Sequence, residues 1–319
     1  MVTCGWSADP PGGDPGARDR YRVSRRPADP PPAPKASRPT AAMNDGLAIS
    51  SDRTMVNHDF DTSIVTRIAH RPWPMPDTPW LMTQTWHWLL FAHWRVAATE
   101  LRRMIAPPFE LDLFDGDAWL AVVPFYMTNV AFRGTPSLPW LSSFPELNVR
   151  TYVRVGDRPG IYFFSLDAGR RLAVAAARTL FNLPYHAASM AVDCLSHGLH
   201  YRSVRRAGAP AEFRAEYAPI GAPFSARTGS LDYFLTERYC LYHHDRRGTP
   251  YRLEIHHPPW SLQAAGAEIT TNTMAAASQL TIGGPPSLLH FARRQDVVAW
   301  SPTPLRDASH TREARKAAE

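Results

Sequence analysis

Lysine is almost absent from this chain of 319 residues, in which Lys35 and Lys316 stand against 33 arginines. Both lysines lie near the ends of the chain, in segments that we expect to be tails. The folded part therefore has no amine side chain with which to form a Schiff base. The imbalance is also typical of a codon bias toward G and C, so the scarcity of lysine need not have been selected.

Cysteine and long hydrophobic runs are scarce as well. Cys4, Cys194 and Cys240 are odd in number and too scattered for a zinc or redox motif, which agrees with a reducing compartment. No apolar run approaches the roughly 20 residues that cross a bilayer, and no hydrophobic stretch follows the basic N-terminus as a secretory signal requires. We therefore expect a cytoplasmic protein without a membrane partner.

Several catalytic and binding motifs are missing too. The sequence has no Gly-x-Ser-x-Gly elbow, no cysteine in a protease context and no glycine-rich phosphate loop after a strand. The net charge of +6 is spread over the chain, because the arginine pairs fall in different segments and form no single basic face. Hydrolase, nucleotide-binding and nucleic-acid-binding functions are therefore set aside, and no cofactor is expected.

The composition changes sharply at both ends of the chain. The first fifty residues contain nine prolines and almost no bulky apolar residues, so they cannot bury enough surface to offset the entropy of ordering. We predict a disordered tail over residues 1–60, a single domain over residues 61–300 and a second disordered tail over residues 301–319. Because the first segment is so unlike the rest, translation could start at Met1, Met43 or Met55.

Short strands, hairpin signals and few helices make up the predicted domain. Asp115-Gly116, between residues 109–114 and 118–125, indicates one hairpin, and a turn rich in Gly and Pro joins residues 146–155 to 161–167 in a second. Further strands are predicted at 185–195, 199–204, 212–217, 239–244, 251–256 and 296–300, and helices at 98–105, 169–181, 231–236 and 273–280. The fold class is therefore α+β and rich in β-structure, a barrel or strongly curved antiparallel sheet with a few flanking helices.

Four motifs follow one another along this domain. They are Glu-Leu-Asn-Val-Arg-Thr-Tyr-Val at 146–153, Gly-Ile-Tyr-Phe-Phe-Ser-Leu-Asp-Ala at 160–168, Leu-Thr-Glu-Arg-Tyr at 235–239 and His-His-Pro-Pro-Trp at 256–260. Together they resemble the YqjF-like family of uncharacterised bacterial proteins, over residues 71–300. That family is remotely similar to the acetoacetate decarboxylase superfamily, whose fold is a β-barrel flanked by helices and whose best-known members hold a keto acid in the barrel.

The remote resemblance also implies a set of site residues. The decarboxylases carry an alanine-rich helix with an arginine, then a proline turn and two lysines, of which the first forms the Schiff base. Here Arg178 lies in the matching helix, and Tyr185 and His186 stand where the two lysines would be. Glu146 matches the acidic residue that the decarboxylases place in the cavity. The resemblance therefore implies a cavity with changed chemistry, with Glu146, Tyr185 and His186 as catalytic candidates and Arg178 as a ligand contact.

Independently of the resemblance, every second residue of the segment 146–153 is polar. One face of the predicted strand therefore carries Glu146, Asn148, Arg150 and Tyr152. One interpretation is a solvent-facing surface with an exposed ion pair of little energetic value. The other is a cavity wall on which Glu146 acts as acid or base, Arg150 anchors a carboxylate, and the remaining two side chains contact the ligand.

Alternatives remain for the other polar candidates. Tyr185 and His186 follow a proline at the junction of a helix and a strand. Either both side chains point into the cavity, or the tyrosine packs in the barrel and the histidine faces outward. Glu237 beside Arg238 is expected to tie elements together, although Glu237 is kept as a ligand contact in case it enters the cavity. Two histidine pairs, at 243–244 and 256–257, fit no recognised ligand motif, so no metal is predicted.

These features favour a protein that binds a small organic acid or oxo compound in its barrel. If the protein is an enzyme, we expect non-covalent acid/base chemistry instead of a Schiff base. A carrier or sensor without catalysis could use the same barrel, and a protein-interaction module could use the aromatic residues at its surface. Assembly into a homo-oligomer is left open by the sequence.

Overall fold

The computed structural model describes residues 60–135, 137, 142–170, 174, 181, 183–245 and 247–305. Within this part of the chain, thirteen strands belong to one sheet. They are β1 (Met82–Val96), β2 (Glu110–Leu111), β3 (Ala118–Phe132), β4 (Phe144–Val155), β5 (Arg158–Ala168), β6 (Tyr185–Leu195), β7 (Gly198–Arg205), β8 (Glu212–Pro219), β9 (Cys240–His244), β10 (Pro250–His256), β11 (Leu262–Asn272), β12 (Leu288–Ala299) and β13 (Thr303–Pro304). The helices are α1 (Ala98–Met104) and α4 (Leu231–Thr236), with the 3-10 turns η2 (Thr62–Thr66) and η3 (Ala276–Ser278).

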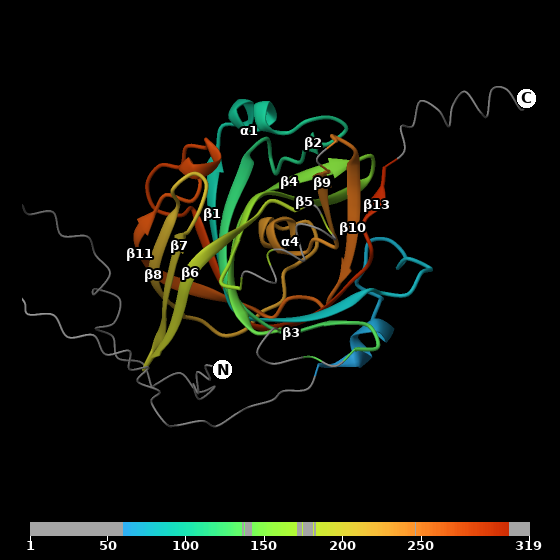
Figure 1. Cartoon of the computed structure of the whole chain (residues 1–319), viewed down its shortest axis with the longest axis horizontal. Helices are drawn as coiled ribbons and strands as arrows, with labels where there is room; N and C mark the ends of the chain where they lie inside the picture. The colour runs from blue at the N-terminus through green and yellow to red at the C-terminus, as the bar shows by residue number, and fades with distance from the viewer. Residues whose placement is uncertain are drawn as a thin grey trace, which may run out of the picture. The chain divides into compact units, whose positions relative to one another are not determined.

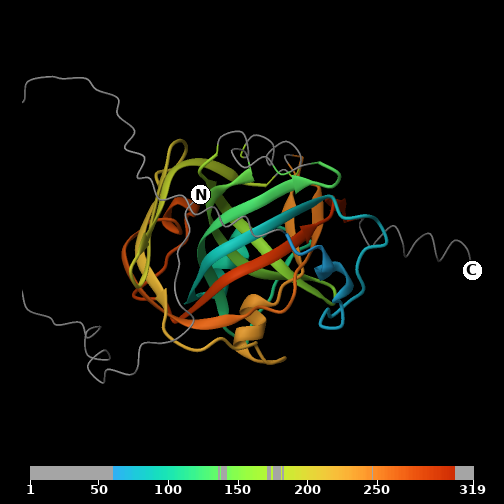
Figure 2. The same ribbon diagram turned by 90° about the horizontal axis from the view of Figure 1, so that it is seen from below.

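The strands close into a barrel, which confirms the predicted fold class. The order β5-β6-β7-β8-β11-β12-β1-β3-β4 returns to its first strand, because β4 also pairs with β5. These neighbours are antiparallel except β5 and β6, which run parallel. Figure 1 looks into the ring of strands with α4 inside its outline, and in Figure 2 the same helix lies at one end of the strands.

The wall of the barrel forks along β5 and β12. The first half of β5 pairs with β9 at Ile161 and Tyr162, whereas its second half pairs with β6 from Leu166. In the same way β12 pairs with β11 near Ala292 and with β10 at Val298. One limb of the fork is therefore β6-β7-β8-β11 and the other is β9-β10, seen on opposite sides of Figure 1.

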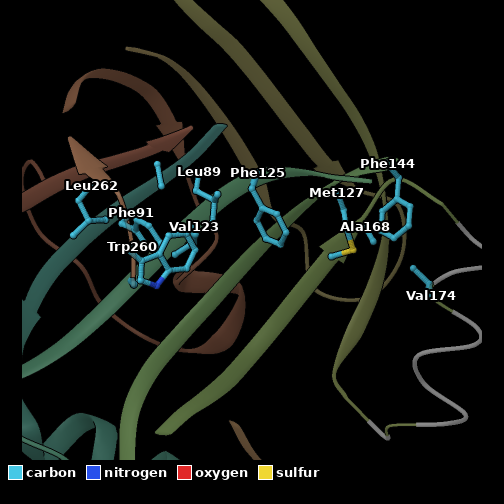
Figure 3. Close-up of a cluster of buried hydrophobic side chains, with 12 residues drawn as sticks. Leu89, Phe91, Val123, Phe125, Met127, Phe144, Ala168, Val174, Trp260 and Leu262 are labelled. Carbon is cyan, nitrogen blue, oxygen red and sulfur yellow. The ribbon is translucent and has the colours of Figure 1, made fainter. Parts of the chain in front are cut away.

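Two hydrophobic clusters face the interior. The first is drawn in Figure 3 and gathers side chains mainly from β1, β3 and the start of β4, together with Trp260 and Leu262. The second brings together side chains from β5, β9, β10 and β12. Burial of these apolar surfaces stabilises the barrel at about 25 cal/mol for each Å² removed from water. Side chains of both clusters line one cavity, and both clusters pack against Trp86, Val130 and Tyr185.

The first predicted hairpin is wrong in its pairing. β2 pairs with β4 and not with β3, and the Asp115-Gly116 turn joins only the bridge between Phe114 and Asp117. The reason is that both edges of β3 are already occupied, by β1 from Ala118 onward and by β4 from Leu120 onward. The segment before the turn therefore takes the edge of β4 that β3 leaves unpaired.

The second hairpin and most of the shorter strands lie close to their predicted positions. No strand was predicted for β1 or β11, and only the end of β12 was predicted. The sequence of β11 is rich in alanine, and the alternation in β1 is broken at Trp88, which has φ 54°. The predicted helix at 273–280 contains a single 3-10 turn, η3. Beyond the expected boundary at residue 300, Thr303 and Pro304 pair with β10. The predicted helix at 169–181 lies largely outside the described residues.

Candidate functional site

A cavity of about 580 Å³ lies between the β9-β10 limb and the strands β1, β3, β4 and β5. Most of its lining is apolar and comes from the two hydrophobic clusters. The polar lining residues are Gln84, Thr135, Ser142, Glu146, Asn148, Arg150, Tyr185, Thr236, Arg238 and His257. A concave, mainly apolar pocket with a few polar groups is the usual form of a small-molecule site.

The strand β4 supplies three of these polar groups in alternation. Glu146, Asn148 and Arg150 all line the cavity, with exposed fractions of 2%, 6% and 6%. The solvent-facing interpretation of this row is therefore wrong. Their neighbours Leu147 and Val149 are fully buried on the other face, so β4 is covered on both sides.

Glu146 is paired with Tyr185 across the cavity wall. The Tyr185 hydroxyl donates to Oε2 of Glu146 at 3.1 Å, because the parallel pairing of β5 and β6 places Tyr185 beside Leu166 and close to the start of β4. Burial raises the pKa of the Glu146 carboxyl to about 8, against the hydrogen bonds from Tyr185 and Asn148 that favour its anion. Burial and the neighbouring Glu146 also raise the pKa of Tyr185 well above its usual value. The pair is therefore able to hold or release a proton near neutral pH.

Arg150 is a buried cation without an acidic partner among the described residues. Its Nη2 lies 3.5 Å from the carbonyl oxygen of Leu235, at the limit of a hydrogen bond, and its Nε contacts no acceptor. Its guanidinium carbon lies 5.3 Å from the centre of the Phe91 ring. Burial lowers the pKa of Arg150, an effect that the Tyr152 hydroxyl opposes.

Arg238 reaches the same end of the cavity but is already neutralised. Its Nη1 donates to Oδ2 of Asp112 at 2.6 Å, and its Nε donates to the carbonyl of Phe234 at 2.7 Å. The positive charge of Arg238 lowers the pKa of Arg150. Two guanidinium groups therefore share this end of the cavity, and only that of Arg238 is paired with a carboxylate, the one of Asp112. An anion in the cavity would complete the charge balance at Arg150.

Comparison with known proteins places this barrel in a family. The sequence profile of DUF2071, described as an uncharacterized conserved protein, matches residues 83–296. The chain belongs to the DUF2071 family. The uncharacterized protein YqjF of Bacillus subtilis (strain 168) is 48% identical over 232 residues, which are 73% of this chain and 94% of that protein. The YqjF-like resemblance is therefore confirmed.

Solved structures share the fold of this DUF2071 protein at low sequence identity. An acetoacetate decarboxylase from Legionella pneumophila aligns with a TM-score of 0.51 and 13% identity, over 77% of this chain and 96% of that one. The enduracididine biosynthesis enzyme MppR, with HEPES buffer bound, aligns with a TM-score of 0.50 and 11% identity, over 72% and 90% of the two chains. The barrel is thus of the acetoacetate decarboxylase-like type.

Three of the predicted site residues do not line the cavity of the DUF2071 barrel. His186 lines a separate pocket of about 450 Å³, because neighbours on a strand point to opposite faces and Tyr185 takes the inward position. Tyr152 packs in a separate hydrophobic cluster with Trp119 and Leu235, and its hydroxyl donates to the carbonyl of Leu235. Glu237 is occupied in tying elements together, since Tyr239 donates to its Oε2 and the backbone N–H of Trp260 donates to its Oε1. Arg178 lies outside the described residues.

Six polar residues of the cavity lining were given no ligand role by the sequence: Gln84, Thr135, Ser142, Thr236, Arg238 and His257. Arg238 was expected only to tie elements together. His257 was considered only as a metal ligand, and no metal was predicted. The two nitrogens of His257 contact the carbonyl oxygens of Pro258 and Arg238 at 2.8 and 3.3 Å. Within the described ranges, no three His, Cys, Asp or Glu side chains gather closely enough to hold a metal ion. No helix in those ranges is long and apolar enough to cross a membrane.

The raised pKa of Glu146 predicts a pH dependence of stability in the DUF2071 protein. Between its usual pKa of 4.5 and about 8, the folded protein holds a proton that the unfolded chain has lost. The contribution of Glu146 to the free energy of unfolding therefore falls as pH rises through this range, by up to about 1.4 kcal/mol per pH unit. Glu146→Gln should remove this component, which urea unfolding of both proteins at pH 5 and pH 8 would measure. Equal pH slopes in the two proteins would contradict a raised pKa.

Proposed function

We propose that this protein binds an organic acid in the cavity, with Arg150 holding the carboxylate and Glu146 with Tyr185 exchanging a proton with the ligand. The observation that carries the proposal is the burial of Arg150 without a carboxylate partner among the described residues. A charge in an apolar interior is costly unless it is paired, and a guanidinium is well suited to bidentate pairing with a carboxylate. The ligand would then supply the missing partner.

The form of the interior supports ligand binding over a protein-interaction surface. The polar groups line one mainly apolar cavity and not a face of the molecule. The same fold occurs in an acetoacetate decarboxylase and in MppR, a structure of which is complexed with the condensation product of pyruvate and imidazole 4-carboxaldehyde. A barrel of this type is therefore compatible with a small molecule in its interior.

The Glu146–Tyr185 pair supports chemistry without a covalent intermediate. Efficient general acids and bases have a pKa near the working pH, and burial raises the pKa of Glu146 to about 8. Tyr185 stays protonated and donates to Glu146, so the protonated Glu146 carboxyl can in turn donate to an oxygen of the ligand. Proton transfer to or from a carbon or oxygen of the bound acid is therefore the reaction class we propose.

Calorimetry with matched ligands tests this proposal. A panel of carboxylic acids, from pyruvate to decanoate, would be titrated beside the neutral amide of each acid. We expect at least one acid to bind the wild type and its amide to bind at least about tenfold more weakly, because hydrogen bonds to charged groups contribute about 1.5–3 kcal/mol.

The matched control uses two arginines on one strand. Arg150→Met should lose the preference for acids, whereas Arg154→Met should keep it, because Arg154 is exposed and lies outside the cavity lining. Equal binding of acids and amides by the wild type, or an unchanged preference in Arg150→Met, would refute the role of Arg150.

Treatment with borohydride provides a separate prediction. Because the two lysines of the chain, Lys35 and Lys316, both fall outside residues 60–305 of the sequence, incubation with acetoacetate and borohydride should leave the mass of those residues unchanged. Mass spectrometry of peptides covering residues 60–305 would detect a reduced adduct. An adduct within those residues would overturn the non-covalent chemistry.

A further inference from the structure

The lining of the cavity extends along the strand β4. It follows β4 from Phe144 to Arg150, six residues or roughly 20 Å at 3.3 Å per residue. Figure 3 shows the apolar wall along this length, with Phe144 and Met127 toward one end, Phe125 between, and Phe91 and Trp260 toward the other. A ligand that fills this space must itself be elongated.

The two polar groups that would contact a ligand stand apart along β4. Glu146 and Arg150 are four residues from each other, about 13 Å along the strand. The Glu146 carboxyl is held toward Tyr185, whereas the Arg150 guanidinium is turned toward Leu235 and Phe91. This spacing along the strand exceeds the length of a molecule such as pyruvate.

The volume of the cavity leads to the same conclusion. At the loose packing of liquid water, about 30 Å³ per non-hydrogen atom, an oxo acid of six such atoms fills roughly 180 Å³. The cavity measures about 580 Å³, so most of it would remain empty or hold water against apolar walls. An acid of twelve non-hydrogen atoms fills roughly 360 Å³ on the same basis.

We propose that the ligand is a carboxylic acid with an elongated apolar body and a second oxygen function several carbons from the carboxylate. The carboxylate lies at Arg150, the second oxygen lies beside Glu146 and Tyr185, and the apolar body packs against the two hydrophobic clusters. This inference rests on the proposed function, which places an acid at Arg150, and it adds the class of acid.

A homologous series of straight-chain acids tests the length. From butanoate to decanoate, the dissociation constant measured by calorimetry should fall about fourfold for each added methylene, at about 0.8 kcal/mol per buried CH₂, while pyruvate binds weakest. Positional isomers test the second oxygen. Because Tyr185 donates its one proton to Glu146, the protonated Glu146 carboxyl is the donor to a distant oxo group, and 9-oxodecanoate should bind about two- to tenfold more tightly than 2-oxodecanoate.

Variants at the far end of the cavity test the geometry. Ala299 lies beside Met82 at the start of β1, whereas the far end of β1 pairs with the residues of β3 that neighbour Arg150. Ala299→Leu places a larger side chain in the lining at that end, so the chain length that binds most tightly should become shorter. Ala131→Leu, another substitution of a lining residue on β3, provides the same test if the first variant folds poorly.

The outcomes separate the two proposals. If pyruvate binds as tightly as decanoate, or if neither leucine variant shortens the preferred chain, the elongated ligand is refuted while an acid at Arg150 stands. If no acid binds, or if Arg150→Met binds the series as the wild type does, the proposed function fails and the further inference fails with it.

Discussion

Replacing Arg150 with methionine should make the ligand-free protein more stable, by about 1–4 kcal/mol in the free energy of unfolding. Methionine has a similar length and fills an apolar gap well, whereas the guanidinium is buried without a carboxylate among the described residues. The lost contacts are a 3.5 Å approach to the Leu235 carbonyl, an interaction with the Tyr152 hydroxyl and one with the Phe91 ring, and we expect the cost of burying the unpaired charge to exceed them. Urea unfolding at pH 7 in the absence of added acids would measure the gain.

The same substitution should abolish the preference for acids, so stability and binding change in opposite directions. A residue that destabilises the empty protein but is needed for the ligand is typical of a binding site and not of a structural position. Arg154→Met provides the reference, because Arg154 lies on the same strand, is exposed, and should change stability by no more than about 0.5 kcal/mol. A loss of stability in Arg150→Met would mean that Arg150 has a structural partner, and the binding role would then lose its main support.

Arg205→Met should have the opposite effect on stability, a loss of about 3–5 kcal/mol. Arg205 is as deeply buried as Arg150, but its Nε and Nη2 donate to both carboxylate oxygens of Asp167 over 2.6–3.2 Å. Asp167 is fully buried on β5, so removing the arginine leaves an uncompensated negative charge in the interior. Thermal and urea unfolding of the variant would measure the loss.

Arg202→Met is the matched control for this prediction. Arg202 lies on the same strand as Arg205, and its partner Asp193 is 3.5 Å away with both side chains about half exposed. Exposed ion pairs contribute roughly 0–1 kcal/mol, so this variant should remain close to the wild type. Similar stability in the Arg202 and Arg205 variants would show that the buried pair does not stabilise the barrel.

The Arg205–Asp167 pair also bears on the catalytic candidate. The negative charge of Asp167 contributes to the raised pKa of Glu146, although burial is the larger cause. Tyr201 adds a second link, because its hydroxyl donates to the backbone carbonyl of Glu146 at 2.7 Å. Tyr201 on β7 therefore holds the backbone of β4 at the residue whose side chain enters the cavity.

The sequence predicted the elements whose signals are local. Alternating polar residues on β4 placed Glu146, Asn148 and Arg150 on one face, and the Gly-Pro turn predicted the hairpin of β4 and β5. A period of two residues fixes which side chains share a face, and turn residues fix which strands are neighbours. The family resemblance added the barrel, which no single segment specifies.

Tertiary structure alone decided which of these faces enclose a cavity and which charges meet. The split between Tyr185 and His186 depended on which face of β6 turns inward, and the pairing of β2 depended on edges already occupied by distant strands. Whether a buried arginine has a partner depended on side chains far away in the sequence, Asp167 for Arg205 and none of the described carboxylates for Arg150. Such relations arise from closure of the barrel, because residues distant in sequence become neighbours only when the sheet returns to its first strand.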